Sequence, residues 1–262
     1  MKIFLFLHVF LFVFINGITF ASYAATPLTV KVYLPDNFDT NRHQIPNTPQ
    51  LTETFDYFER EAGLKFIIVT LPWKRAQLEA LQGRGILYGY SKSSERLEQY
   101  RFSQPVITLH IWAISYGPAN ANLAQLSDLK GKVVASGLGL SHGIEYEKTK
   151  NKLFTVQEDF ATAPEHLKKL INKRCDVILL PFRQQLSRKE VDNVVNRSLV
   201  PDFKDLELND KQFNISVNPI FYDTVHFASG KGHNNEVIGR IDQAIQKGMK
   251  NGSLPKLLQK YQ

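Results

Sequence analysis

The sequence predicts an α/β fold in which mostly parallel strands alternate with helices. In the first alternation, β-prone runs at 28–34, 65–71 and 85–90 are separated by two stretches whose apolar residues recur at helical spacing. A second alternation, from 132 to 180, places a helical stretch between two further β-prone runs. This rhythm is typical of parallel sheets covered by helices.

The helix boundaries follow from local chemistry. Thr48 and Pro49 suit a helix start and Gly63 a helix stop, which predicts a helix between them. A shorter helix over 73–81 and a long amphipathic helix over 234–250 follow from the same spacing of apolar residues.

The amino-terminal segment has the pattern of a secretory signal peptide. A strongly apolar stretch runs from Ile3 to Phe20, and small residues at Ser22 and Ala24 suit cleavage after Ala24. The alternative is an uncleaved membrane anchor, because the apolar stretch is close to spanning length. We expect export across a membrane and a mature chain that begins after Ala24.

Charge and cysteine content exclude several classes of function. The chain has 32 basic and 25 acidic residues, and the basic residues are spread out instead of forming the stripe expected of nucleic-acid binding. The single cysteine, Cys175, can form no internal disulfide and is expected to be a small buried side chain. His142 and Glu145 could suggest a metal pair, but the other histidines are scattered, so we expect no metal and no other cofactor.

A candidate anion site follows the third predicted strand. The run Gly85–Tyr90 ends in a predicted polar loop that carries Ser91, Ser93 and Arg96. Ligands of open α/β sheets bind beyond the carboxyl ends of the strands, and a guanidinium with nearby hydroxyls suits an anionic small molecule. The alternative is a surface arginine paired with a neighbouring glutamate.

A glycine-bearing loop follows the predicted strand over 132–135. Gly137 allows close approach of the backbone to a ligand, and Ser141 adds a hydroxyl before a helical stretch whose free N–H groups could hold an anion. A plain strand-to-helix turn explains the loop equally well. Neither a P-loop nor a strict dinucleotide fingerprint is present, which argues against nucleotide binding.

Four motifs occur in a characteristic order: Pro72-Trp-Lys-Arg-Ala76, Glu95-Arg96, Phe102-Ser-Gln-Pro105 and Asp128-Leu-Lys-Gly-Lys132. This order resembles the family 3 solute-binding proteins, which are periplasmic receptors of ABC importers. More narrowly, it looks like a proteobacterial subgroup that carries the PWKRA motif. The resemblance implies a two-lobed periplasmic binding protein type II fold, in which each lobe is a mostly parallel sheet flanked by helices.

The resemblance also implies the domain organisation. Residues 1–24 would be the signal peptide, 25–110 and 219–262 the two parts of lobe 1, and 111–218 lobe 2. The chain would cross between the lobes twice, in the β-prone runs that begin at Val106 and Ile215.

In this family an arginine at the position of Arg96 pairs with the ligand's carboxylate, with a hydroxyl from Ser91 or Ser93 on the same anion and the carbonyl of Gly89 facing a ligand ammonium. The expected aromatic and backbone walls of the ligand cleft are formed by Trp73, Tyr88, Tyr90, Tyr33, Gly137 and Ser141.

Two departures from the family pattern bear on the ligand. The third strand opens with Gly83-Arg-Gly-Ile86, which lacks the usual aspartate. Receptors for α-amino acids place an acid just after the second-lobe strand, and here Pro181-Phe-Arg-Gln184 has none. This puts an ordinary amino-acid ligand in question and leaves room for a carboxylate without the amine, or for an aromatic solute.

The resemblance implies a monomeric, periplasmic binding protein that captures a small polar solute, an amino acid or a related carboxylate, and delivers it to the membrane permease of an ABC importer. The first alternative is a ligand-sensing subunit of a membrane signalling partner. The second is a secreted dehydratase or lyase on the same fold. Catalysis is disfavoured because the motif positions supply no poised carboxylate or histidine pair.

Overall fold

The computed structural model describes residues 26–36, 38, 43–117, 123–199 and 212–260. The predicted signal peptide lies outside these residues. The strands are β1 (Leu28–Pro35), β2 (Leu64–Leu71), β3 (Ile86–Ser91), β4 (Tyr100–Phe102), β5 (Ile107–Gly117), β6 (Val133–Gly137), β7 (Thr155–Asp159), β8 (Val177–Phe182), β9 (Gln212–Ile215) and β10 (Phe221–Gly230).

The α-helices are α1 (Pro49–Ala62), α2 (Trp73–Leu81), α3 (Ser94–Gln99), α4 (Ile144–Thr149), α5 (Ala163–Ile171), α6 (Arg188–Asn193), α7 (Asn235–Asn251) and α8 (Ser253–Gln259). A 3₁₀ turn covers Leu126–Leu129, and a π-helical segment covers Val194–Leu199.

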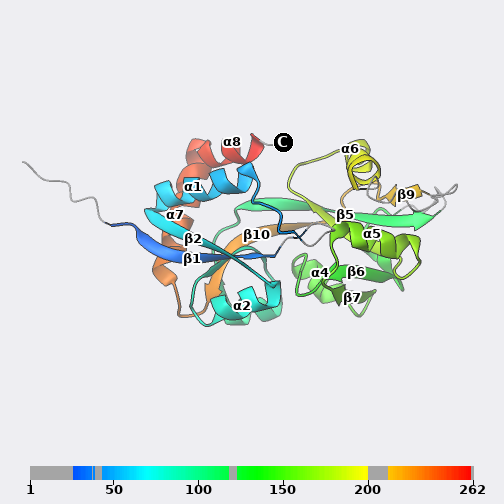
Figure 1. The fold of residues 1–262 in the computed structure, drawn as a ribbon, viewed down its shortest axis with the longest axis horizontal. Helices are drawn as coiled ribbons and strands as arrows, with labels where there is room; N and C mark the ends of the chain where they lie inside the picture. The colour runs from blue at the N-terminus through cyan, green and yellow to red at the C-terminus, as the bar shows by residue number, and fades with distance from the viewer. Residues whose placement is uncertain (1–25, 37, 39–42, 118–122, 200–211, 261–262) are drawn as a thin grey trace, which may run out of the picture.

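The described strands form one mixed sheet, ordered β2-β1-β3-β10-β5-β8-β6-β7, with β4 beside β10 and β9 beside β5. Figure 1 shows this sheet as two bodies joined by the long strands β5 and β10. We call the body with β1–β3, α1, α2, α7 and α8 lobe 1, and the body with β6–β8 and α4–α6 lobe 2. The α/β prediction is confirmed.

Lobe 1 is built around parallel pairing of β1 with β2 and with β3. Helices α1 and α7 bury an aromatic cluster against this sheet, in which Phe227 lies 5.0 Å from Phe58 and 4.9 Å from Tyr88, measured between ring centroids. Burying side chains of this size supplies the main favourable term of folding, about 25 cal/mol per Å2 of apolar surface.

The predicted ends of α1 are confirmed. The Thr48 hydroxyl accepts a hydrogen bond from the N–H of Leu51 at 3.3 Å, and Pro49 occupies the first turn. Gly63 ends the helix with φ 62°, a left-handed conformation that costs glycine little and other residues more.

Lobe 2 has β6 between β7 and β8, all parallel. Its core includes Cys175, which is buried as predicted, and burial raises the pKa of that thiol to about 11. The thiol is therefore protonated at neutral pH and packs as a small apolar side chain.

The two crossing strands lie side by side. β10 pairs antiparallel with β5 from Phe221 opposite Ile111 to Val225 opposite Ile107, and β5 continues along β8. The run that was expected to cross from Val106 contains the central strand β5. The run expected from Ile215 is divided, because Ile215 ends β9 and the crossing strand β10 begins only at Phe221. The exact lobe boundaries, 110 and 218, stay a prediction.

Three short elements differ from the sequence-based expectation. The predicted polar loop after β3 is the helix α3, which Ser93 caps by accepting a hydrogen bond from the N–H of Arg96 at 3.1 Å. Strands β4 and β7 were not predicted. Each of these elements has six residues or fewer, which is too short for a hydrophobic period to show.

Within the described residues, no helix is both long and apolar enough to cross a membrane.

We expect Phe227→Ala to reduce the free energy of unfolding by about 3–5 kcal/mol, because it opens a cavity at the centre of the lobe 1 core. Chemical denaturation of the mature protein measures this change. Met249→Ala on α7 is the matched control, since Met249 is 56% exposed and its truncation should cost less than about 0.5 kcal/mol. Equal effects of the two substitutions would contradict this description of the core.

Candidate functional site

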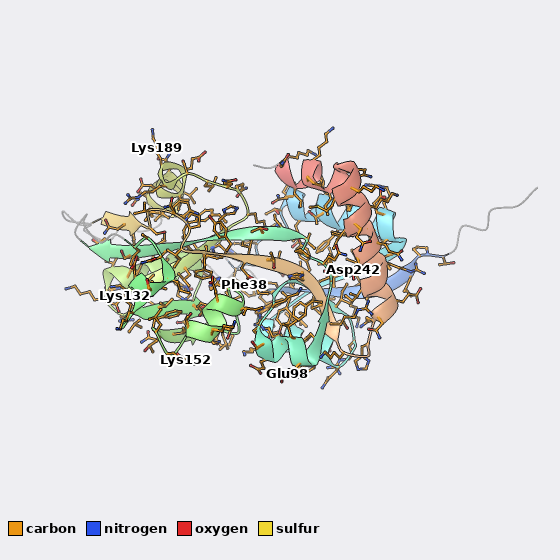
Figure 2. The ribbon with its side chains drawn as sticks, turned by 180° about the vertical axis from the view of Figure 1, so that it is seen from behind. Phe38, Glu98, Lys132, Lys152, Lys189 and Asp242 are labelled. Atoms are coloured by element: carbon orange, nitrogen blue, oxygen red, sulfur yellow. The ribbon has the colours of Figure 1, made fainter. Side chains whose placement is uncertain are left out.

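The candidate site lies where the two lobes meet. A cavity of about 350 Å3, which we call the interlobe cavity, opens between them and takes its lining from both lobes. The lining residues are Pro35, Asp36, Phe38, Pro72 and Trp73 from lobe 1, and Gly137, Leu138, Leu140, Asp159, Phe160 and Ala161 from lobe 2. Figure 2 labels Phe38 close to the junction between the two bodies.

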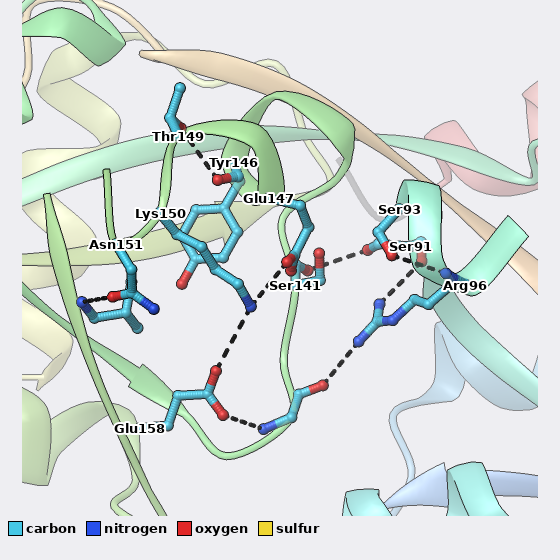
Figure 3. Close-up of polar contacts among 12 residues, drawn as sticks. Ser91, Ser93, Arg96, Ser141, Tyr146, Glu147, Thr149, Lys150, Asn151 and Glu158 are labelled. Carbon is cyan, nitrogen blue, oxygen red and sulfur yellow. Dashed lines mark hydrogen bonds and ion pairs between the residues drawn. The ribbon is translucent and has the colours of Figure 1, made fainter. Parts of the chain in front are cut away.

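Arg96 connects the lobes beside this cavity. Its guanidinium donates one hydrogen bond to the carbonyl of Ser91 in lobe 1, at 2.9 Å, and another to the carbonyl of Gly139 in lobe 2, at 3.0 Å (Figure 3). The described residues contain no ion pair between Arg96 and an acid, so the surface pairing considered for this residue is absent there. Within the described residues, the half-buried guanidinium therefore has backbone carbonyls as its hydrogen-bond partners at the junction.

The Arg96 guanidinium lies over the face of the Tyr90 ring. The guanidinium carbon of Arg96 lies 4.1 Å from the Tyr90 ring centroid, and this ring stacks on Phe102 and meets Trp73 edge to face. Burial raises the pKa of the Tyr90 phenol far above its ordinary value. The phenol therefore stays neutral and its ring presents the negative face that favours a cation.

The acceptor in lobe 2 is also held in place. Glu158, next to the end of β7, accepts the N–H of Gly139 at 3.1 Å, and Lys150 lies 3.9 Å from the same carboxylate and 2.8 Å from Glu147 (Figure 3). The N–H and the carbonyl of Gly139 belong to successive peptide groups, and each makes a hydrogen bond, the first to Glu158 and the second to Arg96. The backbone on both sides of the Gly139 Cα is therefore held in place.

Two more hydrogen bonds join the lobes at this loop. Gln77 donates to the Gly139 carbonyl at 3.1 Å, and the Ser91 hydroxyl donates to the Ser141 carbonyl at 3.2 Å. Gly139 has φ 75°, and a Cβ there would lie 2.8 Å from Cε of Lys74. Both the conformation and the close approach of lobe 1 therefore favour glycine at this position.

The structure brings most of the predicted site residues together. Trp73 and Gly137 line the interlobe cavity, Ser91 and Ser141 bond to each other beside it, and Tyr90 supports Arg96. Four predicted residues lie elsewhere. Ser93 caps α3, and Gly89 has φ 82° within β3. The Tyr33 hydroxyl donates to the Arg84 carbonyl at 3.0 Å, and Tyr88 packs in the lobe 1 core. Of the predicted site residues, Trp73 and Gly137 are the two in the lining of the interlobe cavity, and Arg96 is not part of that lining.

Two acids of the cavity were missed from the sequence. Asp36 follows β1, and burial raises the pKa of its carboxyl group. Asp159 ends β7; burial pushes its pKa up, but contacts with Lys169, His166 and the N–H of Ala161 outweigh this and leave the pKa below the ordinary value. Both acids lie at carboxyl ends of parallel strands, which is the signal that could have found them.

His142 packs in the protein interior beside the glycine loop. Its ring lies 5.0 Å from Tyr146 and 6.2 Å from Phe221, between centroids, and burial lowers its pKa to about 4. The side chain of Glu145, its suggested metal partner, lies at the surface. In the part of the chain that the structure describes, no three His, Cys, Asp or Glu residues gather as a metal site would require.

Comparisons with known proteins show which sequences and folds this chain resembles. No protein-family model matches the chain. The chain is 26% identical over 216 residues to the probable amino-acid-binding protein YxeM of Bacillus subtilis (strain 168), covering 79% of this chain and 75% of YxeM.

Solved structures similar to the chain include an ancestral arginine-binding protein bound to arginine, with a TM-score of 0.62 and 19% identity over 90% of this chain and 98% of that one. A histidine kinase sensor domain described as similar to periplasmic binding proteins also has a TM-score of 0.62, with 17% identity over 88% of this chain and 95% of that one. The chain has the periplasmic binding protein type II fold.

We expect the free energy of unfolding to fall as the pH drops from about 6.5 to about 4. Burial lowers the pKa of both His142 and His226 to about 4, so only the unfolded chain binds protons at these sites in that window. The loss should be on the order of 3 kcal/mol for each histidine.

His142→Phe should remove part of this pH dependence, measured as urea unfolding at a series of pH values. Met249→Ala on α7, which changes no titratable group at an exposed position, is the control and should leave the pH dependence as it is in the wild type. A His142→Phe protein with the unchanged wild-type slope would show that His142 is protonated without unfolding.

Proposed function

We propose that the protein is a substrate-binding protein that encloses a small carboxylate-bearing solute, an amino acid or a related molecule, between its lobes. The observation that carries the proposal is the position of Arg96, a charged guanidinium that binds backbone carbonyls of both lobes beside the interlobe cavity. The sequence similarity to the probable amino-acid-binding protein YxeM supports the same class of ligand.

The geometry suggests how a carboxylate would bind. The Arg96 donors now bind two neutral carbonyl oxygens, and a carboxylate would offer two charged acceptors in a geometry that matches the guanidinium fork. The Ser91 hydroxyl donates to the Ser141 carbonyl and the Ser141 hydroxyl accepts the N–H of Gly143, so a carboxylate bound here would replace the Ser141 carbonyl as the acceptor for Ser91. The Tyr90 ring keeps the Arg96 guanidinium oriented, which reduces the conformational entropy that this side chain loses when the solute binds.

The rest of the solute would occupy the interlobe cavity. Trp73, Phe38 and Phe160 give it aromatic walls, and Asp36 gives it a hydrogen-bond acceptor. A cavity of about 350 Å3 suits a molecule the size of an amino acid.

Closure of the lobes would couple solute binding to recognition by a partner. A ligand that touches both lobes favours the closed arrangement by the difference between its affinities for the closed and open forms. We propose that the closed form is recognised by the membrane permease of an ABC importer. Export to the periplasm by a cleaved segment ending at Ala24 belongs to the same proposal.

The likeness to a histidine kinase sensor domain supports a second candidate function, in which the same closure is read by a signalling partner. We favour transport because the curated relative with sequence similarity is named as an amino-acid-binding protein. We favour binding over catalysis because the proteins that resemble this chain are binding proteins and sensor domains.

We expect Arg96→Ala to weaken binding of the solute by about 100-fold or more, because it removes a charge-assisted bidentate contact. The measurement is calorimetry with a solute first identified by thermal shift in a screen of amino acids, dicarboxylates and aromatic acids. Arg96→Lys should restore only part of the affinity, since lysine lacks the planar fork.

Arg101→Ala is the matched control, because Arg101 bonds Asn235 at 3.1 Å on the surface of lobe 1, and it should bind like the wild type. Unchanged affinity in Arg96→Ala would move the carboxylate site elsewhere. A mature protein that no compound in the screen stabilises would argue against the proposed function as a whole.

A further inference from the structure

An acid in the crossing strand β10 has an unsatisfied carboxylate oxygen. Asp223 is 7% exposed, and its Oδ1 accepts the N–H of Thr224 at 2.7 Å. Its Oδ2 is buried and has no hydrogen-bond partner among the described residues. A buried carboxylate oxygen without a partner is rare and costly in proteins, so its presence calls for a physical reason.

Asp223 lies between the two lobes. On one side lies the Ser91 hydroxyl of lobe 1, which is near enough to act on the carboxylate as a hydrogen-bond donor and lower its pKa, but donates to the Ser141 carbonyl here. On the other side a Cβ added to Gly143 of lobe 2 would lie 2.4 Å from Oδ1 of Asp223. Burial dominates and raises the pKa of Asp223 overall. Separation of the lobes would move Ser91 away from Gly143, so the approach of the lobes is what encloses this carboxylate.

The cations in the neighbourhood have other partners. The Arg96 guanidinium binds the carbonyls of Ser91 and Gly139, and it acts on Asp223 only through its charge. The ammonium of Lys92 lies 5.8 Å from the Phe102 ring centroid and forms no ion pair with Asp223. Within the described residues the acid is therefore left without a counter-ion.

Next to Asp223 is a second cavity of about 270 Å3, which we call the hinge cavity. Its lining, drawn from both lobes and β10, comprises Lys92, Ile144, Glu145, Tyr222, Asp223 and Thr224. The cavity thus combines two carboxylates and the ammonium of Lys92 with an apolar side chain and an aromatic ring. Tyr222 and Ile144 are 59% and 38% exposed, so these walls are open to an incoming molecule.

The chemistry of the missing partner is restricted. A carboxylate only accepts hydrogen bonds, so the group that satisfies Oδ2 must donate, and a positive charge strengthens that bond. Apolar and aromatic walls suit an organic cation better than a hydrated metal ion.

We propose that Asp223 is the acid of an ammonium subsite at the hinge, where an ammonium group pairs with Oδ2. The ammonium is either the amino group of the solute held at Arg96 or that of a separate small amine in the hinge cavity. In the first case the inference rests on the proposed function, and the ligand is then a zwitterionic amino acid. In both cases closure is favoured by the cation, because closing without it buries an unpaired charge.

Whether the ammonium is the amino group of the solute is tested with matched pairs of compounds that differ only in that amine. These are L-glutamine with 4-carbamoylbutanoate, L-phenylalanine with 3-phenylpropanoate, and L-arginine with 5-guanidinopentanoate, measured by calorimetry on the mature chain. In the wild type, the amine-bearing member of a pair that binds should be tighter by about tenfold or more. Asp223→Asn should reduce this ratio to about threefold or less, because the amide carries no charge.

The control for the charge change is Glu236→Gln on α7, whose carboxylate pairs with Arg240 at 2.7 Å, and it should keep the wild-type ratio. Asp223→Asn retains an oxygen for the N–H of Thr224, so the variant should fold, and thermal unfolding verifies this. Retention of the full ratio in a folded Asp223→Asn protein would overturn the assignment of the solute's amine to Asp223.

A second measurement uses no solute and tests the other source. The carboxyl carbon of Asp223 is titrated by NMR with methylammonium chloride or with potassium chloride at equal ionic strength. Methylammonium should lower the pKa of Asp223 more than potassium does if the subsite accepts an ammonium.

If the two compounds of a pair bind equally and methylammonium lowers the pKa of Asp223, the subsite binds a separate amine. No binding by any pair, together with a methylammonium effect, keeps the subsite and argues against the proposed function. Absence of both the discrimination within pairs and the methylammonium effect overturns the inference.

Discussion

The antiparallel pairing of β10 with β5 is the constraint on which the rest of the structure depends. It joins two α/β bodies into one sheet and fixes where the ends of their strands face each other. The end of β3, which leads into Arg96, and the loop after β6, which carries Gly139, meet because of this pairing. The acid in β10 itself then lies between them. The candidate site is thus a product of the crossing strands more than of either lobe.

The sequence allowed prediction of the elements whose signals are local. Helices α1 and α7 were predictable because apolar residues recur along one face, and the ends of α1 were predictable from Thr48 and Gly63. The strand before Arg96 was predictable from its apolar, β-prone residues, and the position of the arginine beyond that strand indicated a ligand site. These features depend on neighbours in the chain, so one sequence suffices to recognise them.

The remaining features depend on contacts between distant segments. Asp36, Asp159 and Asp223 come from three different strands and were not recognised as site residues, because each alone resembles a strand-end or turn acid. Asp223 in particular lies within a β-prone run that was expected only to cross between the lobes. Tyr88 illustrates the opposite case: the sequence placed it near Arg96, but its ring shares the lobe 1 core with Ile86. Strict alternation would put Tyr90 on that same face, but Gly89, with φ 82°, interrupts the alternation and Tyr90 lies on the other face.

The order of the strands along the chain also governs how the molecule can be assembled. Phe227 and the inner face of α7 belong to the same core as β1 and α1, although nearly the whole of lobe 2 is encoded between them. Lobe 1 is therefore the first lobe to be synthesised and the last to have its core completed. Until the carboxyl-terminal helices are synthesised, the growing polypeptide exposes the apolar faces of α1 and β2 that later pack in the lobe 1 core.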